Sequence, residues 1–177
     1  MEAFISMKSK EFMFPQRFVL GTVGMPGERT FFLQVLSDTN LMSFSLEKQQ
    51  AALLASEIAN LLDEVGFEIG SDQSPDLEPL SQPIEDEFRI GGLSISWLSD
   101  LAAVCIEMSP SMESDADIEV ETLMDSVIKV VISAISARHF VSRTLAVVRA
   151  GRPPCPFCLI PIDPTGHICV RSNGYRR

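Results

Sequence analysis

The sequence has few of the side chains that usually perform acid–base catalysis near neutral pH. It contains two histidines, His139 and His167, and one tyrosine in 177 residues. It also lacks an uninterrupted apolar stretch of the roughly 18 residues that a membrane-spanning helix requires, because Lys, Arg, Glu or Asp breaks each candidate. We therefore expect no transmembrane helix, and the scarcity of histidine leaves little material for a conventional catalytic set.

The N-terminus does not resemble a signal peptide. Residues 1–15 mix Glu2, Lys8, Lys10 and Glu11 with short apolar pieces, without a long apolar core or a small-residue cleavage site. We therefore expect a cytoplasmic protein. Thiols stay reduced in that compartment, so paired cysteines there favour metal binding over disulfides.

Basic residues are scarce before Arg138, and acidic residues are scarce after it. Residues 138–177 hold seven arginines and one acid, a net charge of +6, whereas the rest of the chain holds seven basic and 23 acidic residues, a net charge of −16. Such asymmetry is typical of a basic segment that contacts an acidic surface, either its own body or a partner's. The candidate anion-binding residues are Arg152, Arg171, Arg176 and Arg177.

The first half of the chain predicts three strands followed by a helix. A turn at residues 25–28 has Pro26 at its second position and Gly27 at its third, the pattern of a type II turn between two strands. Ser45 is the expected N-cap of an amphipathic helix over residues 46–65, which Gly66 ends. No Gly-Lys-Ser/Thr follows the early glycines, so a phosphate-binding loop is not favoured. The expected strands are residues 17–22, 30–36 and 41–44.

The second half predicts the same order of elements, with a defect in its first strand. Along residues 88–97, Phe88 and Ile90 share one face, whereas Leu93 and Trp97 have the opposite parity. A bulge at Gly91-Gly92 would return all these side chains to one face of a sheet. A following strand points Val104, Ile106 and Met108 inward, residues 127–132 form another strand, and Ser133 caps a helix over residues 134–150.

The segments between these elements are acidic, and we expect them to be solvated surface loops. Residues 67–87 hold seven acids and residues 109–126 hold six, with no basic residue in either. The predicted fold is therefore α+β, with two successive strand-strand-strand-helix units that form an antiparallel sheet covered by two long helices. We expect one domain over residues 1–151 and a zinc-binding tail over residues 152–177.

The tail contains four residues with the spacing of a zinc site. Cys155 and Cys158 are separated by two residues, and eight further residues precede His167 and Cys169. A Cys-x-x-Cys turn lets backbone N–H groups point at the sulfurs, and residues two apart in an extended segment share a face. Three thiolates and one imidazole form a closed tetrahedral set, so we expect one structural zinc ion per chain.

Other chemistries are weaker interpretations of the same residues. A redox pair or inert thiols would also fit Cys-x-x-Cys. A zinc deaminase would need His-x-Glu upstream, but the upstream histidine is His139, and Val141 stands where the glutamate is needed. We expect Cys105 to be a packed or half-exposed thiol and His139 a surface histidine, so we assign no catalytic residue.

Four segments together resemble one protein family. They are RFxxGTVGxPGxRTFFLQ from Arg17, LEKQQ from Leu46, AGRPPCP from Ala150 and RSNGYRR from Arg171. Over nearly its whole length the chain is similar to the bacterial domain-of-unknown-function family 3090. That family has no assigned activity, so the resemblance implies kinship but no function.

The favoured interpretation is a cytoplasmic binding or interaction module with a structural zinc ion and no catalysis, whose partner is an unidentified protein or small molecule. A nucleic-acid binder is an alternative, since zinc knuckles and arginines suit single strands and Phe157 and Tyr175 could stack on bases. The charge of −16 on the body opposes that alternative. The third interpretation is an enzyme of unrecognised type that acts on a phosphate-bearing ligand.

Overall fold

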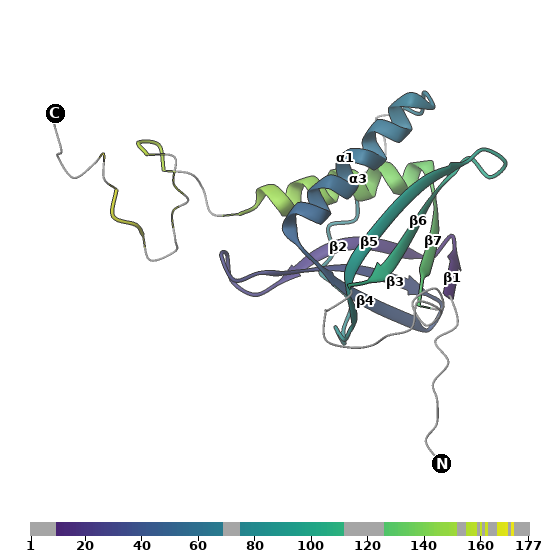
Figure 1. Cartoon of the computed structure of the whole chain (residues 1–177), viewed down its shortest axis with the longest axis horizontal. Coiled ribbons are helices and arrows are strands. Elements are labelled where there is room, and N and C mark those ends of the chain that lie inside the picture. Colours follow the sequence, from purple (N-terminus) through teal and green to yellow (C-terminus); the bar gives the residue numbers. More distant parts are fainter. Residues whose placement is uncertain are drawn as a thin grey trace, which may run out of the picture.

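The structure, a computed structural model, describes residues 10–68, 75–111, 126–151, 155–158, 160, 162, 166–169 and 171. Within these residues the chain forms a seven-stranded sheet in the order β1-β7-β6-β5-β4-β3-β2, with two helices on one face (Figure 1). The strands are β1 (Lys10–Met13), β2 (Arg17–Val23), β3 (Thr30–Ser37), β4 (Asn40–Leu46), β5 (Asp86–Leu98), β6 (Ala103–Pro110) and β7 (Ile128–Ser133). The helices are α1 (Lys48–Glu64) and α3 (Ala134–Arg149).

The predicted α+β class is confirmed, but two details of the predicted architecture are wrong. The sheet is mixed and not purely antiparallel, because β1 pairs in parallel with β7 and β4 pairs in parallel with β5. The chain also does not divide into two strand-strand-strand-helix units, because the unpredicted strand β1 precedes the first three predicted strands. The first strand of the chain therefore lies beside the last one, at one edge of the sheet.

The hydrophobic core lies between the sheet and the two helices. Apolar side chains alternate along the strands, so Leu20 and Leu33 of neighbouring strands point to the same side and are fully buried. Phe18 of β2 stacks on Phe140 of α3 with 4.8 Å between ring centroids, which joins the edge strand to the helix layer. Neither helix in the described part of the chain is long and apolar enough to cross a membrane.

The N-cap of α1 is Glu47, so the prediction of Ser45 as the cap is wrong. Ser45 lies in β4, and its backbone N–H donates to Asp86 Oδ1 at 2.9 Å. The N–H of Glu47 donates to Gln50 Oε1 at 2.9 Å, one half of a capping box. Pairing of β4 with strands on both sides keeps Ser45 extended. At α3 the prediction is confirmed, because Ser133 Oγ accepts from the Ser136 N–H at 3.2 Å.

The bulge predicted in β5 is confirmed. The register between β5 and β6 shifts between Ile90 and Gly92. Ile90 is buried, and Leu93 and Trp97 pack against the same core despite their opposite parity. A Cβ atom at Gly91 would lie 2.4 Å from Ser111 Cα, so the close approach of two backbones at the bulge requires glycine.

The acidic segment 67–87, predicted to be a solvated loop, is partly packed on the sheet. Gln34 lies on the face of β3 that points away from the helices, where it donates to the Ser81 carbonyl at 3.0 Å and accepts from the Ser81 N–H at 2.7 Å. Leu80 is buried against Gly21 of β2. The second acidic segment, predicted as a loop over residues 109–126, lies largely outside the described residues.

Asp76 ties the same segment to the edge strand β2. Arg17 Nη2 donates to Asp76 Oδ1 at 3.1 Å, and the buried Arg143 of α3 lies 3.4 Å from the same oxygen. Arg143 Nε also donates to the Leu20 carbonyl at 2.7 Å. The hydrogen bond from Arg17 is the main cause that lowers the pKa of Asp76, and burial lowers the pKa of Arg143. One carboxylate therefore compensates two guanidinium groups at this edge.

Candidate metal centre

The four predicted metal ligands lie together at the C-terminal end of the chain. The N–H of Cys155 donates to the Ile160 carbonyl at 2.9 Å, which closes a tight turn around Cys158. Gly166, immediately before His167, has a φ of 87°, a left-handed conformation that suits glycine. The ligand atoms of Cys155, Cys158, His167 and Cys169 all lie within 4.8 Å of one another.

The distances within this cluster suit a tetrahedral metal ion. Cys155 Sγ lies 3.7 Å from Cys169 Sγ, and Cys158 Sγ lies 3.2 Å from His167 Nε2. Zinc–sulfur bonds of about 2.3 Å in a regular tetrahedron place two sulfur atoms about 3.8 Å apart. A disulfide would require about 2.05 Å. The residues present therefore could hold a metal ion and are compatible with zinc.

In this segment the cysteines are buried and large apolar side chains are exposed, which is the reverse of an ordinary hydrophobic core. The side chains of Cys155 and Cys169 are 2% and 7% exposed. The large apolar side chains around them point outward, with Phe157 60%, Ile160 52% and Ile168 82% exposed. The cysteines therefore form the interior of this short segment, as in small domains that a metal ion folds.

Backbone hydrogen bonds favour the thiolate form of both Cys155 and Cys158, but they prevail only at Cys155. Burial acts to raise the pKa of Cys155, but hydrogen bonds from the backbone of Cys158 and Phe157, together with those from the thiols of Cys158 and Cys169, outweigh it and bring that pKa to about 7. A backbone hydrogen bond from Ile160 acts in the same direction on Cys158, yet burial and the neighbouring thiols raise the pKa of Cys158 overall. Negative charge on several sulfurs at once thus requires a cation between them.

Of the four arginines predicted to bind anions, Arg171 lies among the described residues. Arg171 Nη1 donates to the Phe157 carbonyl at 3.1 Å, so it braces the Cys-x-x-Cys turn. Arg152, Arg176 and Arg177 lie outside the described residues, as does Tyr175. In Figure 1 the described pieces of the tail lie beyond the end of α3, well separated from the sheet.

Cys105 and His139 do not form a catalytic pair. Cys105 is buried with Ala103 and Val131 on the face of the sheet opposite the main core, and burial raises its pKa. It is thus a packed thiol, as predicted. His139 lies on α3, on the other side of the sheet; its ring is half-buried, so the expectation of a surface histidine is only partly met. Its Nε2 atom has no hydrogen-bond partner among the described residues.

The structure also contains a hollow that the sequence analysis did not predict. Arg29 and Lys48 line it, and Arg89 lines its neighbour. These three residues come from segments far apart in the sequence. No pattern in the sequence connects them, and only the fold brings together three of the seven basic residues that precede Arg138.

Comparison with protein-family models gives a match over most of the chain. The family model described as protein of unknown function (DUF3090) matches residues 10–169, which include the whole sheet, both helices and all four residues of the Cys/His cluster. No curated protein matches the chain.

Proposed function

The chain belongs to the DUF3090 family, and we propose that it is a binding or interaction module whose C-terminal tail is folded by one structural zinc ion. The observation that carries this proposal is the convergence of Cys155, Cys158, His167 and Cys169, whose ligand atoms lie within 4.8 Å of one another. The proposal includes a reducing, cytoplasmic location, because it requires free thiolates.

A structural role for the ion follows from the number of ligands. Catalytic zinc sites usually offer three protein ligands and keep one position for water or substrate. Here three cysteines and one histidine would fill the tetrahedron, so a substrate would find no open position. We therefore assign the ion no catalytic step.

The zinc-folded tail would present a contact surface to a partner. With the ligands inside, Phe157, Ile160 and Ile168 point outward and offer apolar contacts. The tail also carries four arginines and one acid, a net charge of +3, which would favour an acidic partner surface or the acidic body of the chain itself. Exposed pairs of this kind contribute only about 0–1 kcal/mol each, so the apolar contacts would have to add to the affinity.

Metal analysis of the purified full-length protein tests the zinc assignment. We expect close to one equivalent of zinc in the wild type and loss of most of it in Cys158→Ser. Cys105→Ser is the matched control, because Cys105 is a buried cysteine outside the cluster and should leave the metal content unchanged. Full zinc retention in Cys158→Ser would refute the assignment.

A second candidate function is binding of single-stranded nucleic acid, which the positions of Phe157 and Arg171 favour. The exposed ring of Phe157 is available for base stacking, and Arg171 is held on the carbonyl of the same residue. Fluorescence anisotropy with labelled RNA and DNA tests it. The candidate requires binding whose log–log salt slope is about 0.7 for each phosphate contacted, and which Phe157→Ala and Arg171→Ala both weaken.

A further inference from the structure

A cavity of about 250 Å³ lies where three distant segments of the chain meet. The turn between β2 and β3 contributes Arg29, the first residue of α1 is Lys48, the end of α3 contributes Val147 and Val148, and Gly151 follows that helix. A second hollow of about 220 Å³ shares Arg29 and Lys48 with the first and extends toward Arg89. Pockets for drug-sized ligands begin at roughly 300 Å³, so this space suits a small molecule and not a macromolecule.

The cavity concentrates positive charge in an acidic protein. Arg29, Lys48 and Arg89 are three of the seven basic residues that precede Arg138, in a part of the chain whose net charge is −16. Arg89 is compensated by an ion pair with Glu47. Lys48 has no ion pair or hydrogen bond within the described residues, and Arg29 donates to the Ala150 carbonyl at 2.8 Å without a described carboxylate partner.

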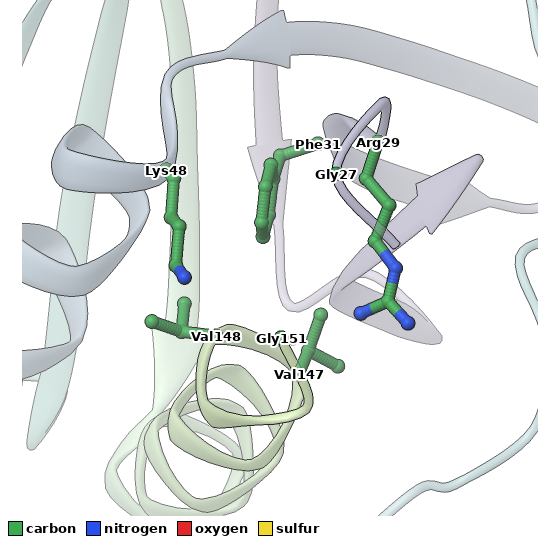
Figure 2. A pocket seen from close by; sticks show the side chains of 7 residues that line it. All are labelled: Gly27, Arg29, Phe31, Lys48, Val147, Val148 and Gly151. Carbon is green, nitrogen blue, oxygen red and sulfur yellow. The ribbon is translucent and has the colours of Figure 1, made fainter. Parts of the chain in front are cut away.

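The arrangement of the side chains suits a ligand that consists of an anionic group attached to an apolar part. Figure 2 shows Lys48 and Arg29 on either side of the ring of Phe31, with Val147 and Val148 across the cavity from that ring. A Cβ atom at Gly151 would lie 3.3 Å from Lys48 Nζ, so glycine at this position leaves room for the ammonium group. The cationic groups therefore flank an apolar surface.

The start of α1 lies at the cavity but already has an anionic cap. The helix has 17 residues and begins at Lys48, on the wall of the cavity. Backbone N–H groups of a first helical turn and the helix dipole both favour negative charge at this end. The N-cap Glu47 already places a carboxylate at this end, where its side chain accepts from the backbone N–H of Gln50, so the attraction for a ligand anion comes from Lys48 and Arg29.

We propose that the cavity between Arg29 and Lys48 binds a small organic phosphate, with the phosphoryl group between the two cationic side chains and the organic part against Phe31, Val147 and Val148. This site lies in the folded body and uses none of the four metal ligands. It is therefore independent of the zinc proposal. It also places anion binding at residues other than the four arginines that the sequence predicts.

Calorimetric titration of full-length protein with three probes tests this proposal. The probes are phenyl phosphate, inorganic phosphate and phenol, which separate the contribution of the anion from that of the apolar surface. We expect phenyl phosphate to bind more tightly than inorganic phosphate. We expect phenol not to bind at concentrations up to about 10 mM, at which a binding free energy of only a few kcal/mol would still be detected. Shifts of the backbone amide signals of Lys48 and Gly151 in NMR spectra should locate the bound probe.

Variants at one position provide the second arm of the experiment. Lys48→Gln should weaken phenyl phosphate binding about tenfold, the usual effect of losing one charged contact. Lys48→Arg should restore much of the affinity, and Lys129→Gln, at a half-buried lysine of β7 that pairs with Glu11 outside the cavity, is the control that should not change it. Cys158→Ser should bind normally, which separates this site from the zinc site.

Three results would overturn the proposal. The first is absence of phenyl phosphate binding at about 10 mM. The second is equal affinity of the wild type and Lys48→Gln. The third is binding of phenol or of inorganic phosphate as strong as that of phenyl phosphate, since the cavity would then recognise only one half of the ligand.

Discussion

Leu80 occupies the space that a Cβ atom at Gly21 would need. That atom would lie 2.5 Å from Leu80 Cγ, well inside contact distance. Gly21 is in β2, whereas Leu80 belongs to the acidic segment that crosses the face of the sheet away from the helices. Glycine at position 21 thus lets a distant segment pack directly on the strand.

Gly21→Ala should therefore destabilise the protein by roughly 1–3 kcal/mol, the usual cost of inserting a methyl group into a packed site. Denaturant unfolding followed by circular dichroism measures this. The matched control is the same change in a Leu80→Ala background, where the space is free and the cost should be smaller by about 0.5 kcal/mol or more. Equal costs in both backgrounds would show that Leu80 is not the cause.

The bulge in β5 gives a second comparison between adjacent glycines. At Gly91 a Cβ atom would meet the backbone of Ser111 at 2.4 Å, whereas at Gly92 it would meet the Ser109 hydroxyl, which can rotate away. Gly91→Ala should thus lower the free energy of unfolding by about 2 kcal/mol more than Gly92→Ala. A larger loss for Gly92→Ala would contradict the bulge geometry.

The Asp76 carboxylate should make stability depend on pH in the acid range. Its folded-state pKa is lowered from 3.8, so its stabilisation is fully present above about pH 4 and is lost as the pH falls through the folded value. Asp76→Asn should cost roughly 1–3 kcal/mol at pH 7, because Arg17 and the buried Arg143 lose a charged acceptor.

The cost of Asp76→Asn should shrink as the pH falls from 4 to 2, as the wild type itself becomes protonated at this site. Glu57→Gln, an exposed change on α1, is the control for general acid effects. Unfolding curves at several pH values measure the difference between the variants. A constant difference from pH 7 to pH 2 would mean that Asp76 is not the titrating group.

Metal removal should affect the tail and leave the body folded. Among the described residues of the tail, the buried apolar side chains are its cysteines, so we expect the tail to depend on the ion, whereas the main core lies between the sheet and the helices. We expect a chelator to speed tryptic cleavage at Arg171 while shifting the melting temperature of the helical signal by less than about 2 °C. A large shift would argue against separate units over residues 1–151 and 152–177.

Local patterns in the sequence predicted those features that depend on neighbouring residues. The spacing of Cys155 and Cys158, and of His167 and Cys169, places each pair of ligands together by chain geometry alone, and the structure brings the two pairs together. The parity change around Gly91 likewise predicted the bulge. The helix start was misplaced because Ser45 and Glu47 both have capping side chains, and pairing in β4 decided between them.

Features that join distant segments were not predictable from such patterns. The two arginine partners of Asp76 lie 59 and 67 residues away, so nothing near Asp76 distinguishes it from the other acids of its segment. The cavity between Arg29 and Lys48 needs the end of α3 as its third wall. β1 has four residues and pairs with β7, to which no local signal connects it.

The pairing of β1 with β7 has a consequence for synthesis of the protein. Lys10 lies opposite Ile128, so β1 leaves the ribosome long before its partner exists. At about 5–20 residues per second the delay is on the order of ten seconds. During that time Phe12, which is buried in the folded protein, lacks the strand that pairs with β1. β1 can therefore complete its edge of the sheet only after residues 128–131 have been synthesised.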